Sequence, residues 1–394
     1  MNPYHEKYLN FYSIDKHSPI FLCPLFAYVV LKKIINLKHK GLFDEFEYYL
    51  GKEYAKILCN IQIESRLSGV DGLKAAFLEF ENFGFGKTKI VVLNKNRIIL
   101  KNLTTSIARQ YSKSFFEDKI KVDNFLSGVY SGILSTYHNT NIEIRESKCY
   151  AQGSQECFFE NTDKVPNNYK LGNIIQNVLR HHRLVGVNEI NYMNLFGEKL
   201  FQRGNYYKKN GIIKIINIYH VFFRFCFFTF SSYIMSKVHK DIEYLYRYLG
   251  YVQVNIAANF QRNQFGRGDS NKIFIELIGN INLFGYGIAK VISKKENEIV
   301  IKFSHMLLLR QCIGFMKTFQ DPYFEGVLVG IPTGNKQHLS RIQVTKSKED
   351  ELIVNLLFGV KENLVNKLSK KIKSKRIKEI IQERMKHKYY LSPS

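Results

Sequence analysis

Apolar and polar residues follow two different periods along the first part of the chain. Apolar residues recur at helical spacing in three early segments, and this pattern predicts helices. The segments are residues 19–35, 41–60 and 70–82. The alternation then changes to the period of strands over residues 89–93 and 97–102, with a polar turn between them. Three helices followed by a β-hairpin are therefore expected.

A second set of elements completes this pattern. Residues 122–136 predict a helix in which Gly128 and Gly132 allow another backbone to approach closely. Residues 141–149 and 156–161 predict two more strands. The order helices, hairpin, helix, hairpin predicts an α+β fold, a helical layer on a small antiparallel sheet.

The chain repeats this pattern in its second half. Short blocks match in the same order, at offsets that change slowly along the chain. The matched blocks are Phe83-Gly84-Phe85-Gly86 with Phe284-Gly285-Tyr286-Gly287, Tyr49-Leu50-Gly51 with Tyr248-Leu249-Gly250, and Gly128-Val129 with Gly326-Val327. We therefore expect a first copy in residues 1–162, a linker in 163–191, a diverged second copy in 192–358 and a basic tail in 359–394.

The net charge and the cysteine content indicate the kind of partner and the cellular compartment. The net charge is +24, and a field of that sign attracts nucleic acid, anionic membrane surfaces or acidic partners. The six cysteines are sparse for 394 residues and imply no disulfide framework, so we expect a reducing, cytoplasmic location. Residues 361–388 are expected to form a basic amphipathic helix, which either packs its apolar stripe on the second copy or contacts a polyanion.

One apolar segment resembles a membrane span. Residues 212–235 are rich in Ile and Phe, but Lys214, His220 and Arg224 interrupt them. A central arginine is costly in hydrocarbon. We expect a buried or interface helix here.

The most specific local motif lies at the end of the first copy. Glu146 precedes Cys149 by three residues, and a turn containing Gly153 leads to Cys157. On an antiparallel hairpin the two thiols can lie close together.

This motif, with the Phe-Gly-x-Gly block and the helix of Gly128 and Gly132, resembles the 4-vinyl reductase domain family. The resemblance covers residues 41–161 and, through the repeat, 240–358. It implies the fold of subunits of the TRAPP vesicle-trafficking complex, which are often dimeric, and a pocket for a small hydrophobic molecule.

The resemblance also implies a metal site. In phenol-sensing transcription regulators of the family, the hairpin cysteines and the glutamate help to hold zinc, so Glu146, Cys149 and Cys157 are the candidate ligands. Those regulators supply a further cysteine from the preceding helix, whereas this chain has Ser127 near that position. Asp123 or His138 could complete the zinc shell. Alternatively, the thiols are a reduced pair that stabilises the hairpin.

The second copy lacks this candidate ligand set. Lys346 stands in place of Glu146 and Glu349 in place of Cys149, and no residue corresponds to Cys157. We therefore expect no such metal site in the second copy.

Two functions from different classes fit these features. The first is a small-molecule sensor or regulator, in which Phe83, Phe85 and Phe125 line a pocket for a hydrophobic ligand, although the same rings are equally suited to a core. The alternative is a scaffold that holds nucleic acid or a protein partner through its basic surface and tail, as a homodimer or an intramolecular pseudo-dimer. No nucleophile–base pair or nucleotide motif can be assigned, so we do not expect an enzyme.

Overall fold

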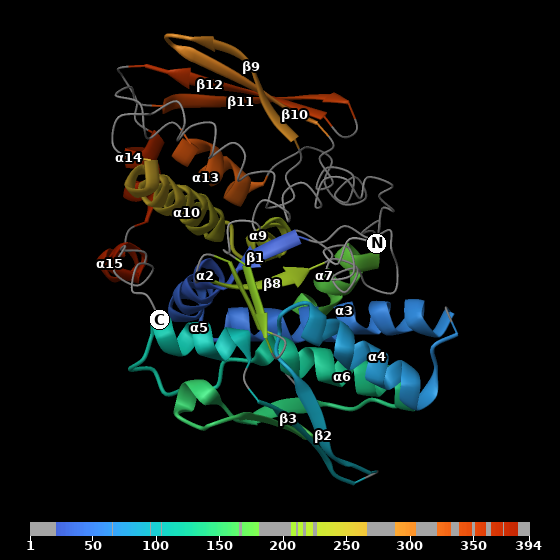
Figure 1. Ribbon diagram of the computed structural model, residues 1–394. Helices are drawn as coiled ribbons and strands as arrows, with labels where there is room; N and C mark the ends of the chain where they lie inside the picture. Colours follow the sequence, from blue (N-terminus) through green and yellow to red (C-terminus); the bar gives the residue numbers. More distant parts are fainter. Residues whose placement is uncertain are drawn as a thin grey trace. The chain divides into compact units, whose positions relative to one another are not determined.

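The structure of the chain is a computed structural model. It describes residues 21–64, 66–94, 96–103, 105–164, 168–180, 206–209, 212–215, 218–223, 227–265, 288–304, 321–331, 339–348, 351–359, 364–372 and 374–384. The chain forms two compact units, and each is described by itself (Figure 1).

The first unit combines helices with a four-stranded sheet. Its helices are α2 (Leu25–Lys38), α3 (Leu42–Glu64), α4 (Gly69–Asn82), α5 (Ser106–Ser114), α6 (Asn124–His138) and α7 (Tyr169–Arg180). Its sheet strands are β2 (Thr88–Leu93), β3 (Ile98–Asn102), β4 (Ile144–Lys148) and β5 (Cys157–Asn161). The predicted helices and hairpins of the first copy are thus present, and apart from the start of α2 they lie within a few residues of their expected ends.

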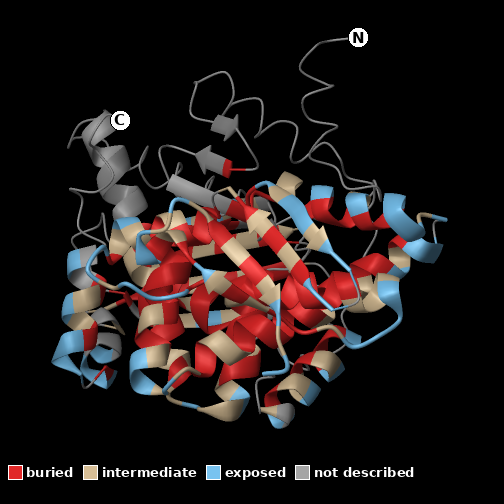
Figure 2. Cartoon of the chain, turned by 90° about the horizontal axis from the view of Figure 1, so that it is seen from below, coloured by how far each residue is buried: buried red, intermediate tan, exposed pale blue. Residues whose placement is uncertain are grey.

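The sheet of the first unit is antiparallel, in the order β2-β3-β5-β4. Buried and half-buried residues alternate along β3, β4 and β5 (Figure 2). This alternation follows from the two-residue period of a strand, which turns successive side chains to opposite faces. The buried face packs on the helices, since α6 contacts β4 and α4 contacts β2.

Glycines set the distance between α3 and α6. A Cβ placed on Gly128 would lie 2.0 Å from the carbonyl oxygen of Tyr48, and one placed on Gly132 would lie 2.3 Å from that of Lys52. From the other helix, a Cβ on Gly51 would lie 2.2 Å from the oxygen of Phe125. The two backbones touch directly, as the spacing of Gly128 and Gly132 predicted.

The second unit also combines helices with a four-stranded sheet. Its first helices are α9 (Phe227–Val238), α10 (Ile242–Phe265) and α13 (Pro322–Gly330). Its strands are β9 (Ile288–Lys295), β10 (Glu298–Ser304), β11 (Leu339–Lys348) and β12 (Glu351–Phe358), which pair in the order β11-β12-β10-β9. This sheet is also antiparallel. The expected α+β class, with two sheet-plus-helix modules, is confirmed.

The repeat extends to backbone contacts between helices. In the second unit, a Cβ on Gly250 would lie 2.2 Å from the oxygen of Tyr323, and one on Gly326 would lie 1.9 Å from that of Arg247. These two glycines were matched to Gly51 and Gly128 by sequence, and they make the same helix-to-helix contacts. The matched block 284–287 lies outside the described residues.

Two sequence predictions for apolar segments need correction. Helix α2 begins at Leu25 instead of residue 19, because Pro24 disfavours the helical conformation of Cys23, and Phe21–Pro24 form strand β1. The single helix expected over residues 212–235 is wrong in its first half. That half forms β7 (Ile212–Ile215) and β8 (Ile218–Phe223), and helix α9 begins only at Phe227. Runs of β-branched and aromatic residues favour strands, and short apolar runs do not distinguish strand from helix.

Strand β7 pairs antiparallel with both β8 and β6 (Tyr206–Lys209), a strand that the sequence did not predict. Within the described residues, no helix is long and apolar enough to cross a membrane.

The basic tail forms two helices where one was expected, α14 (Leu364–Lys371) and α15 (Lys375–Arg384). Ile372, Ile377 and Ile381 are buried. Helix α14 contacts α10 and β11, while Lys370 and Lys375 are exposed. The tail therefore packs apolar residues and leaves lysines in water, which is one of the two arrangements expected.

Candidate metal centre

The hairpin of β4 and β5 turns three acidic or thiol side chains to the same side. Glu146 is buried in β4, and the pairing of β4 with β5 shifts register between Glu146 and Lys148. The shift adds one residue to the ordinary alternation. Lys148 therefore points to solvent and Cys149 is buried. The bulge explains how Glu146 and Cys149, three residues apart, both face inward.

A short turn then returns the chain to the second thiol. The 3-10 helix η1 (Tyr150–Gln152) follows Cys149, and Gly153 adopts φ +94°, which glycine tolerates far better than other residues. Cys157 opens β5, and its Sγ accepts a hydrogen bond from the Tyr150 backbone N at 3.3 Å.

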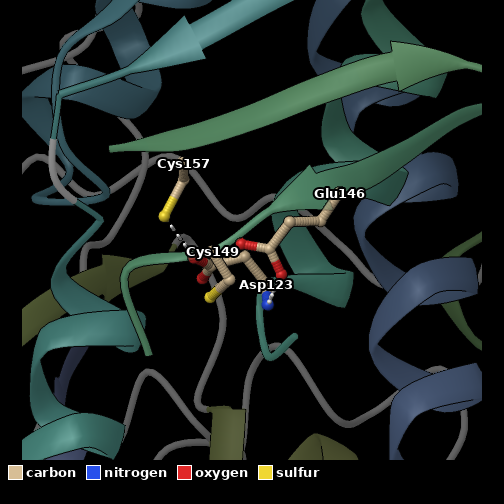
Figure 3. Close-up of side chains that lie close together, drawn as sticks. All are labelled: Asp123, Glu146, Cys149 and Cys157. Atoms are coloured by element: carbon tan, nitrogen blue, oxygen red, sulfur yellow. Dashed lines mark hydrogen bonds between the residues drawn. The ribbon is translucent and has the colours of Figure 1, made fainter. Parts of the chain in front are cut away.

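Asp123, directly before α6, completes the cluster. One ligand atom from each of Asp123, Glu146, Cys149 and Cys157 lies within 4.8 Å of those of the other three, and all four residues are buried (Figure 3). The Cys157 Sγ lies 3.9 Å from Asp123 Oδ2. Both cysteines are free thiols.

The hydrogen bonds of the two carboxylates leave one oxygen of each without a donor. Glu146 Oε2 accepts from the backbone N of Val122 at 2.9 Å and of Asp123 at 3.0 Å. Asp123 Oδ2 accepts from the hydroxyl of Thr105, the residue that caps α5. Among the described residues, no group donates to Glu146 Oε1 or Asp123 Oδ1, although both atoms are buried. A buried carboxylate oxygen without a partner is costly, so these atoms call for a cation or a proton.

The pKa values of the cluster reflect the burial and close packing of its acidic groups. Burial raises the pKa of Asp123 to about 6. Burial, together with the neighbouring Asp123 carboxylate, raises the pKa of Glu146 well above its ordinary value. The hydrogen bond with Cys157, together with burial, raises the pKa of the Cys149 thiol. Burial and mutual repulsion thus favour the protonated forms of these acidic groups. A bound divalent cation would instead favour their ionised forms.

The donor set suits zinc. Thiolates and carboxylates are both zinc ligands, and a structural site takes four of them in a closed, buried shell. Two sulfur and two oxygen donors that converge in a buried cluster meet this description. Cys149, Cys157, Asp123 and Glu146 would hold the ion.

The matching aspartate of the second unit has another role. Asp321 occupies the position of Asp123, five residues before the matched glycine. Its Oδ1 accepts from the backbone N of Tyr323 and of Phe324, and so caps α13. Asp123 makes no such bond to α6, although it stands at the same cap position. In the first unit Glu146 accepts from the N–H groups of residues 122 and 123, just before the helix, and the Asp123 carboxylate lies in the cluster.

Of the two residues that the sequence suggested as a fourth ligand, the structure places only one in the cluster. Asp123 lies in the cluster, whereas His138 is the last residue of α6, at the opposite end of the helix. Ser127 Oγ accepts from the backbone N of Glu146 at 3.2 Å and donates to the oxygen of Asp123, so it joins α6 to β4 beside the cluster. Thr105 was missed, since a lone threonine after a strand carries no sequence signal.

The three candidate ligand-binding phenylalanines lie in the core of the first unit. Phe83, Phe85 and Phe125 are all buried, and the rings of Phe85 and Phe125 stack with centroids 5.1 Å apart. Their role toward a ligand stays a prediction. The predicted counterpart Glu349 lies outside the described residues, as does the side chain of Lys346.

Comparisons with known proteins give a distant relative and a distant structural likeness. No model of a known protein family matches the chain. The uncharacterized protein MJ1460 of Methanocaldococcus jannaschii is 28% identical over 148 residues, which are 37% of this chain and 80% of that protein. A solved structure of the phenol-responsive sensory domain of the transcription activator PoxR, with phenol, has a TM-score of 0.32 and 15% identity. The match covers 39% of this chain and 82% of that one. The resemblance to the 4-vinyl reductase family stays a prediction.

Proposed function

We propose that the first unit is a zinc-braced sensory module that binds a small hydrophobic molecule without catalysing a reaction. The observation that carries the zinc site is the pair of buried, unpartnered carboxylate oxygens of Asp123 and Glu146 beside two free thiols. The ligand class rests on the resemblance of residues 41–161.

The metal would act on the fold of the hairpin. Glu146 lies on β4, Cys149 directly follows that strand, Cys157 begins β5 and Asp123 precedes α6. An ion held by all four joins both strands of the hairpin to the start of α6, the helix that packs on α3. The metal would thereby fix the sheet against the helices around the core that contains Phe85 and Phe125.

Metal content tests this proposal directly. Protein purified without a metal-binding tag is expected to contain about one zinc per chain, and Cys149→Ser is expected to lose it, because one of four ligands is removed. Elemental analysis, together with the melting temperature of each protein, measures both effects.

Cys59→Ser is the matched control, since Cys59 is also a buried free thiol of the first unit but lies on α3, outside the cluster. This variant should keep its zinc. Wild-type protein without zinc after refolding in excess zinc would refute the metal site.

A further inference from the structure

Helix α2 carries a buried cation that the sequence analysis did not single out. Lys32 lies in an apolar helix and is 1% exposed. Its Nζ pairs with the carboxylates of Glu47, also fully buried, and of Asp44, at 2.9 Å for the latter. Burial lowers the pKa of Lys32, but Asp44 and Glu47 outweigh burial and raise the pKa above its ordinary value. The contacts with two carboxyl groups favour the charged form of Lys32.

The third partner of Lys32 leads to the metal centre. Its Nζ donates to the carbonyl oxygen of Val122 at 2.6 Å, and the N–H of Val122 donates to Glu146 Oε2 at 2.9 Å. The carbonyl of Val122 shares its peptide group with the N–H of Asp123, which also donates to Glu146 Oε2, at 3.0 Å. Hydrogen bonds at the two ends of one peptide group polarise one another. Here Lys32 holds residue 122, and residues 122 and 123 hold Glu146.

We infer that Lys32 is a positioning residue of the candidate metal centre. It anchors the backbone at Val122, so that Glu146 Oε1 and the Asp123 carboxylate face the two thiols. The inference rests on the proposed zinc site, and it adds a residue that would contact no metal.

The second unit supplies an internal comparison. Helices α2 and α9 end alike, since the N of His39 bonds to the oxygen of Ile35 and the N of His239 bonds to that of Met235. This match places Ser232 at the position of Lys32, 200 residues on. The matched glycines Gly51 and Gly250 place Tyr246 at the position of Glu47.

Ser232 and Tyr246 are both buried, so the ion pair has no counterpart at these positions. The second unit also has Lys346 and Glu349 in place of two candidate ligands. The buried lysine and the thiol cluster thus occur together in the first unit, and both are replaced in the second.

A second buried pair shows what a purely structural role would look like. Lys52 and Glu143 also form an ion pair between a helix and the sheet region of the first unit. Lys52 Nζ bonds to Glu143 and Asn141, and neither residue belongs to the metal cluster or to the segment of Val122. Lys52→Met therefore tests the loss of a buried lysine without the link to Glu146.

The experiment compares zinc affinities of Lys32→Met, Lys52→Met and wild type by competition with a chelator, alongside the absorption spectrum of the Co²⁺-substituted proteins. Lys32→Met should weaken zinc binding by about 10- to 100-fold, the effect typical of outer partners of metal ligands. It should also alter the Co²⁺ bands. Lys52→Met should leave both unchanged.

A double variant, Lys32→Met with Glu47→Leu, is the control for effects on folding. Replacing both members of a buried ion pair by apolar residues is often tolerated. The double variant should show the same loss of affinity as Lys32→Met. Unchanged affinity in the folded Lys32 variants, or an equal loss in Lys52→Met, would overturn the role of Lys32 alone. Absence of zinc from wild type would overturn the zinc site and this role together.

Discussion

At the scale of single residues, the environment decides what an aspartate does. Asp123 and Asp321 occupy equivalent positions before α6 and α13. Asp321 accepts hydrogen bonds from two backbone N–H groups and from Thr229, and so satisfies its helix end. Asp123 caps no N–H group of α6 and has a buried, unpartnered oxygen, and its carboxylate lies beside Glu146 and the two thiols. The same residue type is a cap in one unit and a candidate ligand in the other.

The acidities of the cluster predict how zinc binding depends on pH. In the metal-free protein the pKa of Cys149 is raised by its bond with Cys157 and by burial. The bond with Cys149 lowers the pKa of Cys157, but burial and Asp123 outweigh it and raise that pKa as well. Zinc binds the thiolates and so releases these protons. Affinity must therefore increase as pH rises.

Between pH 7 and 8 both thiols are protonated before zinc binds. The logarithm of the apparent association constant should then increase by at least two per pH unit, one for each thiol proton released, and by up to one more where Glu146 is protonated as well. Chelator competition at several pH values measures this slope. A slope near zero would mean that the thiols do not bind the ion.

At the scale of elements, the contact of α3 with α6 depends on the absence of side chains. The Cβ of an alanine at 128 would lie 2.0 Å from the backbone oxygen of Tyr48, which cannot move without the helix. Gly128→Ala should therefore lower the free energy of unfolding by about 1–3 kcal/mol, the usual cost of overpacking, in spite of the better helix propensity of alanine. Denaturant unfolding measures this change.

Gly172→Ala in α7 is the control for that variant. The nearest atoms to its added Cβ are ring atoms of Tyr49 at 3.0 Å, and a side chain can yield where a backbone cannot. Its effect should be much smaller. Equal effects of the two variants would show that the α3–α6 backbone contact is not the cause.

The helices and strands also show which elements can be predicted from the sequence. Periodicity located α3, α4, α6 and the hairpins, because each buries one face and so repeats its apolar residues at a fixed interval. Helix α5 was missed, since its short polar sequence has few apolar residues to display a period. The strands β7 and β8 were assigned to a helix, since a short apolar run carries no period that distinguishes the two.

At the scale of the whole molecule, two units share an architecture but differ in their candidate chemistry. The thiol cluster and its buried lysine belong to the first unit. Metal and ligand should therefore stabilise that unit selectively. Zinc, and phenol as a simple hydrophobic probe, should each slow amide hydrogen exchange in β4, β5 and α6 and leave β10, β12 and α13 unchanged.

Hydrogen exchange followed by mass spectrometry measures this difference within one chain, where the second unit serves as the internal control. Protection by phenol that persists in Phe125→Leu, a variant of nearly unchanged core volume, would argue against the proposed ligand-lining role of Phe125. Protection confined to the second unit would contradict the assignment of the sensory role to the first.

The sequence by itself determined the α+β class, the internal repeat, the closely packed glycines and three of the four clustered residues. These features are local or periodic, so the order and spacing of residues along the chain are enough to predict them. Only the tertiary structure chose Asp123 over His138, placed Thr105 beside the thiols and linked Lys32 to Glu146 through Val122. Those contacts join residues between 18 and 90 positions apart, and no spacing along the chain encodes which distant backbone will approach.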